Sequence, residues 1–237
     1  MKVLSTSLQR SKGLDKRVLW SKNTQFFRTP NLVNSYWAGF LAADGCVSPK
    51  QNMVSCRLNS RDEAHLQMLA SSVNYNGRID RRPNYGYSKG RTLCSVLTVC
   101  GVRDWVHDLK ENFNVVERKS LILEPPTTLS RKCGLAYIIG YLDGDGSIFY
   151  QTTPWKVYLG VSVVGTKKVL VWIKKQFDVL IKPGPRVANV GRGKKGYQYR
   201  VTGDRALKIL HKLDTIKTPR LERKWRRLWC WPRVVAR

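Results

Sequence analysis

A twelve-residue pattern occurs twice in this chain of 237 residues and constrains the fold more than any other feature. The segments "YWAGFLAADGCV" (residues 36–47) and "YIIGYLDGDGSI" (residues 137–148) align without gaps, and their last acids, Asp44 and Asp145, lie 101 residues apart. A repeat of that length is long enough for each copy to build a domain-sized unit. The sequence therefore predicts two related halves in tandem.

The segments that follow the two copies share one order of predicted elements. After the first copy come a strand pair (47–60), a helix (61–73), a second hairpin (77–99) and a helix (102–113). After the second copy, the same series covers 147–165, 166–180, 184–203 and 204–213. With its motif helix, each half is an αββαββα unit of an α+β fold. The sheets are expected to be antiparallel, with one face on the helices and the other open.

The expected boundaries follow from this repeat. We predict an N-terminal extension (1–30), a first repeat (31–122), a linker with paired prolines (123–134) and a second repeat (135–237). The tail from Pro219 is expected to form a basic helix, and its Leu221, Trp225, Leu228 and Trp229 form one apolar stripe that favours packing against the core.

Basic residues far outnumber acidic ones. The 43 Lys and Arg residues against 16 Asp and Glu residues give a formal net charge of +27, which indicates a polyanionic partner. No apolar stretch of membrane-spanning length supports a membrane partner, so nucleic acid is the favoured one. Hydrophobic residues make up 42% of the chain, enough to fill a core.

The six cysteines form no C-x-x-C pair, and only three histidines are available as partners. Zinc fingers and disulfide scaffolds are therefore not expected, and the thiols are predicted to be buried in a reducing compartment. The N-terminus lacks the apolar segment of a secretory signal, while its Ser- and Arg-rich, acid-poor composition leaves an organellar transit peptide open. We expect an intracellular protein, either organellar (chloroplast or mitochondrion) or from bacterial or phage-host cytoplasm.

Small residues recur along both motif helices: Ala38, Gly39, Ala42 and Ala43 in the first, Gly140 and Gly144 in the second. Small side chains allow two helices to approach closely, which would bring Asp44 and Asp145 together at negatively polarised helix ends. Two carboxylates about 4 Å apart would repel by roughly 4 kcal/mol at an effective dielectric near 20, and a divalent cation removes that repulsion. The sequence predicts a Mg²⁺ site formed by Asp44 and Asp145 together with Ala43, Gly45 and Gly144.

Two other interpretations of the acidic motif can be tested against the residues at the positions that each one requires. A helical calcium loop starting at Asp143 would need glycine at its sixth position and glutamate at its twelfth, where this chain has Ile148 and Pro154. In the second interpretation, Asp-Gly merely ends a helix and opens a turn. A helix end followed by a turn would explain one Asp-Gly pair. It does not explain why two copies of the motif are followed by the same order of predicted strands and helices.

The chain resembles the LAGLIDADG homing endonucleases, most closely their single-chain, two-repeat members. The resemblance lies in the repeated motif, the order of elements, the excess of basic residues and the length. The resemblance extends from about Asn31 to the C-terminus. It implies that Asp44 and Asp145 ligate shared metals, Mg²⁺ or Mn²⁺, with Ca²⁺ binding but not supporting cleavage. The earlier acid of the motif, Asp143 in one copy and replaced by Ala42 in the other, is interpreted as structural.

The resemblance also implies a basic residue near the metals in each half. Aligning "FNVVERKSL" with "LDTIKTPRL" places Lys217 there in the second half, whereas Glu117 occupies the corresponding place in the first, so Lys119 is the candidate in that half. The catalytic set is thus Asp44, Asp145, Lys119 and Lys217. Polar residues that position water in the family correspond to Ser60 and Gly165, of which only Ser60 has a side chain to do so.

Strand parity identifies candidate DNA contacts on the open sheet faces, where Arg reads guanine and Gln reads adenine in the major groove. In the first half they are Ser48, Lys50, Ser55, Arg57, Asp80, Arg82, Lys89 and Arg91. In the second half they are Phe149, Gln151, Thr153, Lys156, Tyr158, Gln198, Arg200 and Thr202, with Arg192, Lys194 and Lys195 on a basic tip suited to phosphate contact.

We therefore expect a monomeric, intron- or intein-encoded endonuclease that cuts both strands of duplex DNA at a long, asymmetric site. The alternative is an intron maturase on the same fold, which binds its own intron RNA without cleaving DNA. A DNA-binding regulator is a third possibility, but it would be expected to add a helix-turn-helix module, for which little chain remains.

Overall fold

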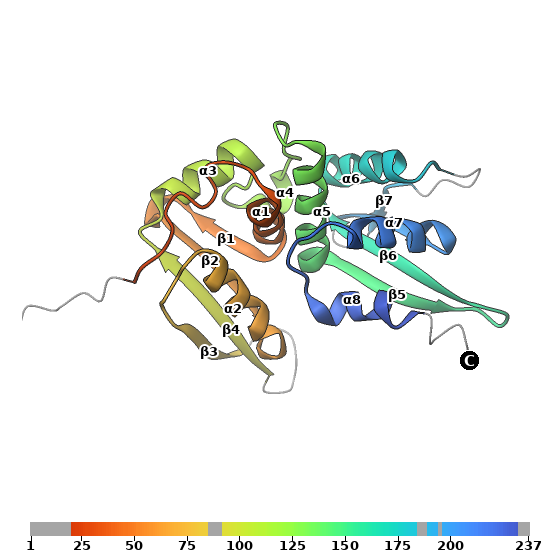
Figure 1. The fold of residues 1–237 in the computed structure, drawn as a ribbon, viewed down its shortest axis with the longest axis horizontal. Coiled ribbons are helices and arrows are strands. Elements are labelled where there is room, and N and C mark those ends of the chain that lie inside the picture. Colours follow the sequence, from red (N-terminus) through yellow and green to blue (C-terminus); the bar gives the residue numbers. More distant parts are fainter. Residues whose placement is uncertain (1–19, 85–91, 184–188, 194–195, 232–237) are drawn as a thin grey trace, which may run out of the picture.

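The computed structural model describes residues 20–84, 92–183, 189–193 and 196–231. The first repeat contains α1 (Leu32–Asp44), β1 (Gly45–Ser48), a 3₁₀ turn η1 (Pro49–Gln51), β2 (Met53–Asn59), a 3₁₀ turn η2 (Ser60–Asp62), α2 (Glu63–Ser72), β3 (Ile79–Asn84), β4 (Thr92–Cys100), α3 (Arg103–Phe113) and the short α4 (Lys119–Ile122) (Figure 1). The second contains α5 (Arg131–Asp145), β5 (Gly146–Thr152), β6 (Val157–Gly165), α6 (Lys167–Leu180), β7 (Gly191–Gly193), β8 (Gly196–Thr202), α7 (Asp204–Asp214) and α8 (Glu222–Trp229). The predicted α+β fold and its two αββαββα units are confirmed.

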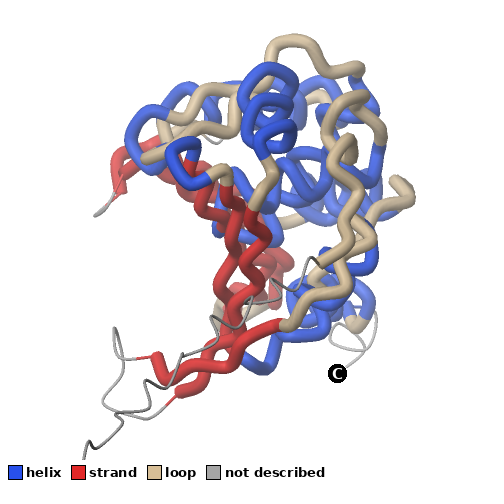
Figure 2. Tube along the Cα trace, turned by 90° about the vertical axis from the view of Figure 1, so that its left-hand side faces the viewer, coloured by secondary structure: helices blue, strands red, loops and turns tan. Residues whose placement is uncertain are grey.

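Each repeat has one four-stranded antiparallel sheet, in the order β1-β2-β4-β3 in the first and β5-β6-β8-β7 in the second. Helices cover one face of each sheet, while the strands of both repeats line a concave surface on the opposite side (Figure 2). Because β1 begins directly after α1 and β5 directly after α5, the two sheets diverge from the ends of the motif helices.

The two motif helices pack side by side through glycine. A Cβ on Gly39 would overlap the carbonyl oxygen of Tyr137, and one on Gly140 would overlap the carbonyl oxygen of Tyr36. A Cβ on Gly144 would collide with the Cβ of Ala43 near the C-terminal ends of the helices. The small residues therefore set the spacing between the halves, as the sequence predicts.

Several boundaries differ from expectation. Residues 20–30, placed in the N-terminal extension, include the fully buried Phe27, and the Trp105 indole donates to the carbonyl of Asn23 at 2.8 Å. Helix α5 begins at Arg131, inside the segment expected to be a linker. Trp229 of the apolar tail stripe is 46% exposed because it lies at the last turn of α8.

The cysteines are all free among the described residues, and their burial was predicted incorrectly in part, since Cys46 and Cys100 are exposed. Both stand on the outward parity of strands β1 and β4, away from the helices. Within the described ranges, no helix has both the length and the apolar composition needed to span a bilayer.

The close helix contact generates a stability prediction. We expect Gly140→Ala to destabilise the protein by about 1–3 kcal/mol or more, because the new methyl group forces the two motif helices apart. Gly134 lies in the same helix, but a Cβ there meets only the Trp172 ring at 3.6 Å. Gly134→Ala is therefore the matched control and should be neutral or stabilising by up to about 1 kcal/mol. Urea unfolding midpoints measure both; equal midpoints would contradict the packing argument.

Candidate active site and DNA-facing surface

Asp44 and Asp145 lie at the C-terminal ends of adjacent helices, where the two sheets begin. Burial and, after it, the neighbouring charge of Asp44 raise the pKa of Asp145 to about 6. Asp44 is exposed on its outer side, yet the protein around it displaces enough water to raise its pKa as well. The amino groups of Lys119 and Lys224 oppose both shifts, so these four side chains form one electrostatic cluster.

The two lysines are anchored to main-chain carbonyls at the ends of the motif helices. Lys119 Nζ donates to the carbonyl of Gly45. Lys224 is only 8% exposed, and its Nζ donates to the carbonyls of Gly144 at 2.6 Å, Gly146 at 2.7 Å and Leu142 at 3.1 Å. Burial lowers the pKa of each amino group, while the nearby carboxylates counteract that effect. Each helix end therefore carries one fixed cation.

The structure does not place Lys217 in this cluster. Lys217 is an exposed residue in the segment between α7 and α8, and it is not among the charges that perturb Asp44 or Asp145. Lys224 occupies the position expected for it. The signal was present in the sequence, because Lys224 lies three residues after Leu221 and directly before Trp225, inside the apolar stripe of the tail helix.

Asp143, the earlier acid of the second motif, is fully buried and joins three parts of the chain. It accepts hydrogen bonds from the Tyr36 hydroxyl at 2.7 Å, the Trp225 indole at 2.7 Å and the backbone N–H of Leu221 at 2.8 Å. Burial raises its pKa, and these bonds counteract the shift. Asp143 therefore fixes the start of α8, the helix that carries Lys224.

The network continues into the first repeat. The Tyr36 hydroxyl donates to Asp143, so its oxygen can accept a hydrogen bond from His65 Nε2, 2.8 Å away. Burial lowers the pKa of His65 to about 4, which keeps the ring neutral near pH 7. Separately, Arg223 of α8 makes a bidentate ion pair with Asp62 at 2.9 Å. Helix α8 thus bridges the two repeats.

The donor set at the centre suits a hard divalent cation. Mg²⁺ is usually held by one or two carboxylates, with water and substrate phosphate completing its shell, and Asp44 and Asp145 provide those carboxylates. The carbonyls of Gly45 and Gly144 accept lysine amino groups here, and Ala43 contributes a packing contact at the helix ends. Over the described part of the chain, no group of three or more His, Cys, Asp or Glu side chains is arranged to hold a metal.

Strand register tests the predicted parity in the first repeat. Ser55 is paired with Thr98, Arg57 and Asp80 each face Val96, and Arg82 faces Cys94, which puts these residues on one face, away from the helices. Ser48 shares that face, whereas Lys50 lies in the η1 turn. Arg82 and Arg78 both contact the carboxylate of Asp80 at 3.0 Å. Predicted Lys89 and Arg91 fall outside the described residues.

The second sheet presents a different set of side chains on its open face. Phe149, Gln151, Tyr158, Gln198, Arg200 and Thr202 share that face by register. Arg200 donates to Gln151 at 3.1 Å and stacks over the Phe149 ring at 4.4 Å, and Gln198 donates to Ser162 at 2.7 Å. These bonds hold the polar groups in place before any ligand arrives.

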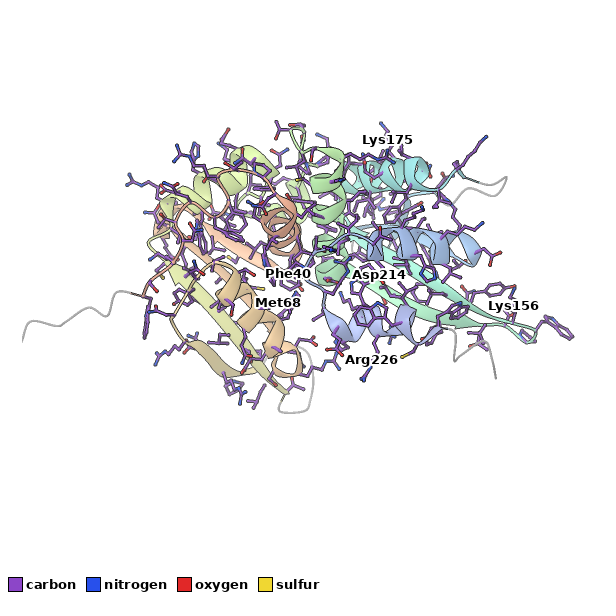
Figure 3. The ribbon with its side chains drawn as sticks, in the orientation of Figure 1. Phe40, Met68, Lys156, Lys175, Asp214 and Arg226 are labelled. Atoms are coloured by element: carbon purple, nitrogen blue, oxygen red, sulfur yellow. The ribbon has the colours of Figure 1, made fainter. Side chains whose placement is uncertain are left out.

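Thr153 and Lys156 close the turn of the β5–β6 hairpin, and Lys156 lies at its outer end (Figure 3). Arg192 is exposed on the edge strand β7 and pairs with Tyr197 on the helix-facing parity, so its phosphate contact stays a prediction. Lys194 and Lys195 lie outside the described residues. Ser60 begins the η2 turn, and the counterpart Gly165 leaves room for the Tyr141 hydroxyl, which a Cβ would overlap.

No protein-family model and no curated protein matches the sequence. Solved structures do match it. I-AabMI, a LAGLIDADG meganuclease bound to uncleaved DNA, has a TM-score of 0.56 at 12% identity over 87% of this chain and 90% of that one.

Two further solved structures agree. I-GzeII, a LAGLIDADG homing endonuclease in complex with its DNA target, has a TM-score of 0.52 at 14% identity, over 88% of this chain and 90% of that chain. I-WcaI, a homing endonuclease bound to its DNA recognition sequence, has a TM-score of 0.52 at 10% identity, over 86% and 88%. This chain has the two-repeat LAGLIDADG fold, which the resemblance in its sequence implies.

The placement of the two lysines gives a prediction that is independent of activity. Lys224→Met should destabilise the protein by about 1–3 kcal/mol, because buried carbonyls lose their charged donor. Lys217→Met, seven residues away along the chain, should change stability by less than about 0.5 kcal/mol, as exposed substitutions usually do. Thermal unfolding of both variants measures the difference. Equal melting temperatures would show that Lys224 is not anchored as described.

Proposed function

We propose that this protein is a site-specific endonuclease that cuts both strands of duplex DNA with the help of a divalent cation held by Asp44 and Asp145. The observation that carries the proposal is the meeting of these carboxylates, at the ends of adjacent helices, where two open sheet faces join in a chain of net charge +27. The shared fold of three DNA-bound endonucleases supports it.

When bound at Asp44 and Asp145, Mg²⁺ or Mn²⁺ supplies a Lewis acid for the scissile phosphate and a bound water of lowered pKa. Ca²⁺ is proposed to bind there without supporting cleavage. Lys119 and Lys224 each place a fixed ammonium group beside the carboxylates. Their role is to stabilise the negative charge that develops on the phosphate, one lysine for each half of the site.

The open faces of the two sheets present different side chains to the DNA. Arg57, Asp80 and Arg82 lie on the first sheet, and Gln151, Gln198 and Arg200 on the second. Because strand ribbons fit the major groove and these side chains prefer different bases, the two half-sites should differ in sequence. The target is proposed to be long and asymmetric, read by one chain acting as a monomer.

A second candidate is an intron maturase that binds its own intron RNA. The helical exterior favours it, because exposed basic residues also lie opposite the concave surface, among them Lys175 on α6 and Arg226 on α8 (Figure 3). Both the endonuclease and the maturase are compatible with an intron-encoded origin and with an organellar or bacterial compartment.

Binding and cleavage should separate at the paired acids. Asp44→Asn or Asp145→Asn should abolish cleavage while specific DNA binding stays within about tenfold of wild type, because the carboxylates hold metal and the strands hold DNA. Asp104→Asn, on the exposed first turn of α3, is the matched control and should cut normally. Cleavage of DNA selected from a random library, with Mg²⁺, measures the effect. Near wild-type cutting by either acid variant would refute the site assignment.

Salt dependence distinguishes the two candidate functions. A protein that covers a long duplex with two basic sheets should neutralise roughly 8 to 12 phosphates, which gives a slope of log K against log salt of roughly −7 to −11. Filter binding at several salt concentrations, with duplex DNA and with a structured intron RNA, measures it. A shallow slope on duplex together with tighter binding to the RNA would favour the maturase instead.

A further inference from the structure

Two adjacent aliphatic side chains project into solvent next to the acidic centre. Leu121 is 89% exposed and Ile122 is 61% exposed, both on the short helix α4. The next residue, Leu123, is 2% exposed, so the chain returns to the core immediately afterwards. A solvated pair of large apolar residues beside a charged centre gains nothing for folding and indicates a contact with a ligand.

The position of this pair is fixed at both ends. Lys119, the first residue of α4, donates to the carbonyl of Gly45 directly after Asp44. On the other side, the Thr166 hydroxyl donates to the carbonyl of Leu123 at 2.6 Å, and the same hydroxyl caps the start of α6. The aliphatic pair is therefore held between the two repeats. It lies on the same short helix as Lys119, which contacts the residue after Asp44.

A cavity of about 690 Å³ separates α4 from the second repeat. Leu121, Ile122, Asp145, Val164, Lys167 and Lys168 are among the residues that line it. Val164 is 44% exposed and is paired with Gln198, which places it on the open face of the second sheet. The cavity therefore adjoins the concave surface, and Asp145 is one of its lining residues.

The spacing of the acids identifies the part of the duplex that would lie here. Two carboxylates at touching helix ends can serve phosphates of opposite strands only where those strands come close together. The minor groove is about 6 Å wide and the major groove about 12 Å. The minor groove of the cleaved segment should therefore face Asp44, Asp145 and α4.

We propose that Leu121 and Ile122 enter the minor groove at the cleavage segment as an apolar wedge that partly unstacks one base step. This inference rests on the proposed endonuclease function. Leucine and isoleucine are used in this way by minor-groove proteins, where unstacking bends the duplex toward the major groove. Lys167 also lines this cavity and can contact a phosphate of the deformed strand, whereas Lys168 pairs with Glu124.

The wedge would act on substrate geometry and not on the metal. Unstacking one base step lowers the cost of deforming the cleaved segment, so the duplex can adjust to the concave surface and to the position of the paired acids. Pyrimidine–purine steps deform most easily. The wedge therefore adds sequence preference at base pairs that receive no hydrogen bond, with TA and CA steps favoured beside the cut.

The test uses a double variant, Leu121→Ser with Ile122→Ser, and DNA selected by the wild-type protein. Val179 on α6 is 62% exposed and outside the cavity, so Val179→Ser is the matched control. With EDTA present, duplexes carrying 2-aminopurine at each step of the cleaved segment report unstacking as a rise in fluorescence. We expect wild type and the control to raise it at one step by at least threefold, and the double variant to leave it unchanged.

Cleavage with Mg²⁺ provides the second readout. The double variant should cut the intact duplex at least tenfold more slowly than wild type, and should recover to within threefold on a duplex with a mismatch at the reporting step. Equal fluorescence and equal rates for wild type and double variant would overturn the wedge. So would light scattering that shows a wild-type dimer converted to monomer by the two serines. If wild type cuts no DNA, the endonuclease proposal fails, whereas the fluorescence arm still decides the wedge.

Discussion

The contact between the two motif helices at Gly39 and Gly140 is the constraint on which the rest of the structure depends. Each glycine lets a main-chain carbonyl of the other helix approach to a distance that no side chain would permit. Because the helices touch along their length, their C-terminal ends and the acids that follow lie together. The strands that start there then diverge into two sheets, so a single helix–helix contact determines both the acidic centre and the concave surface.

That arrangement concentrates negative charge, since two carboxylates meet at the negatively polarised ends of two helices. The basic composition of the chain does not by itself offset this, because exposed lysines are screened by solvent and salt. Two partly buried ammonium groups, on Lys119 and Lys224, sit against the helix-end carbonyls and compensate locally. Burial, and after it the charge of Asp44, still raises the pKa of Asp145 to about 6 with both lysines present, so a divalent cation at this point would stabilise the ionised carboxylates.

Much of this architecture could be predicted from the sequence, because its signals are periodic and local. The in-frame motif gave the two repeats, alternation within strands gave the open faces of both sheets, and small residues gave the helix contact. The position of Lys224 could not be obtained in that way. It depends on a long-range arrangement in which Asp143, Tyr36 and Trp225 dock α8 across the repeats. Alignment of the two halves pointed to the exposed Lys217 because Lys224 lies ten residues beyond the end of α7, whereas Lys119 lies six residues beyond the end of α3.

The two halves reach similar charge at their helix ends by different routes, and the difference explains the unequal motifs. In the first repeat, α4 follows α3 after a few residues, so Lys119 arrives through a short connection and Ala42 needs no polar partner. In the second, the lysine is carried by a helix that follows α7 and must be docked. Asp143 supplies the buried acceptor for the Leu221 N–H and the Trp225 indole. A buried carboxylate therefore has hydrogen-bond donors of the docked helix to satisfy at the second motif and, among the described residues, none of that kind at the first, which accounts for Asp143 in one copy and Ala42 in the other while the terminal acids stand in both.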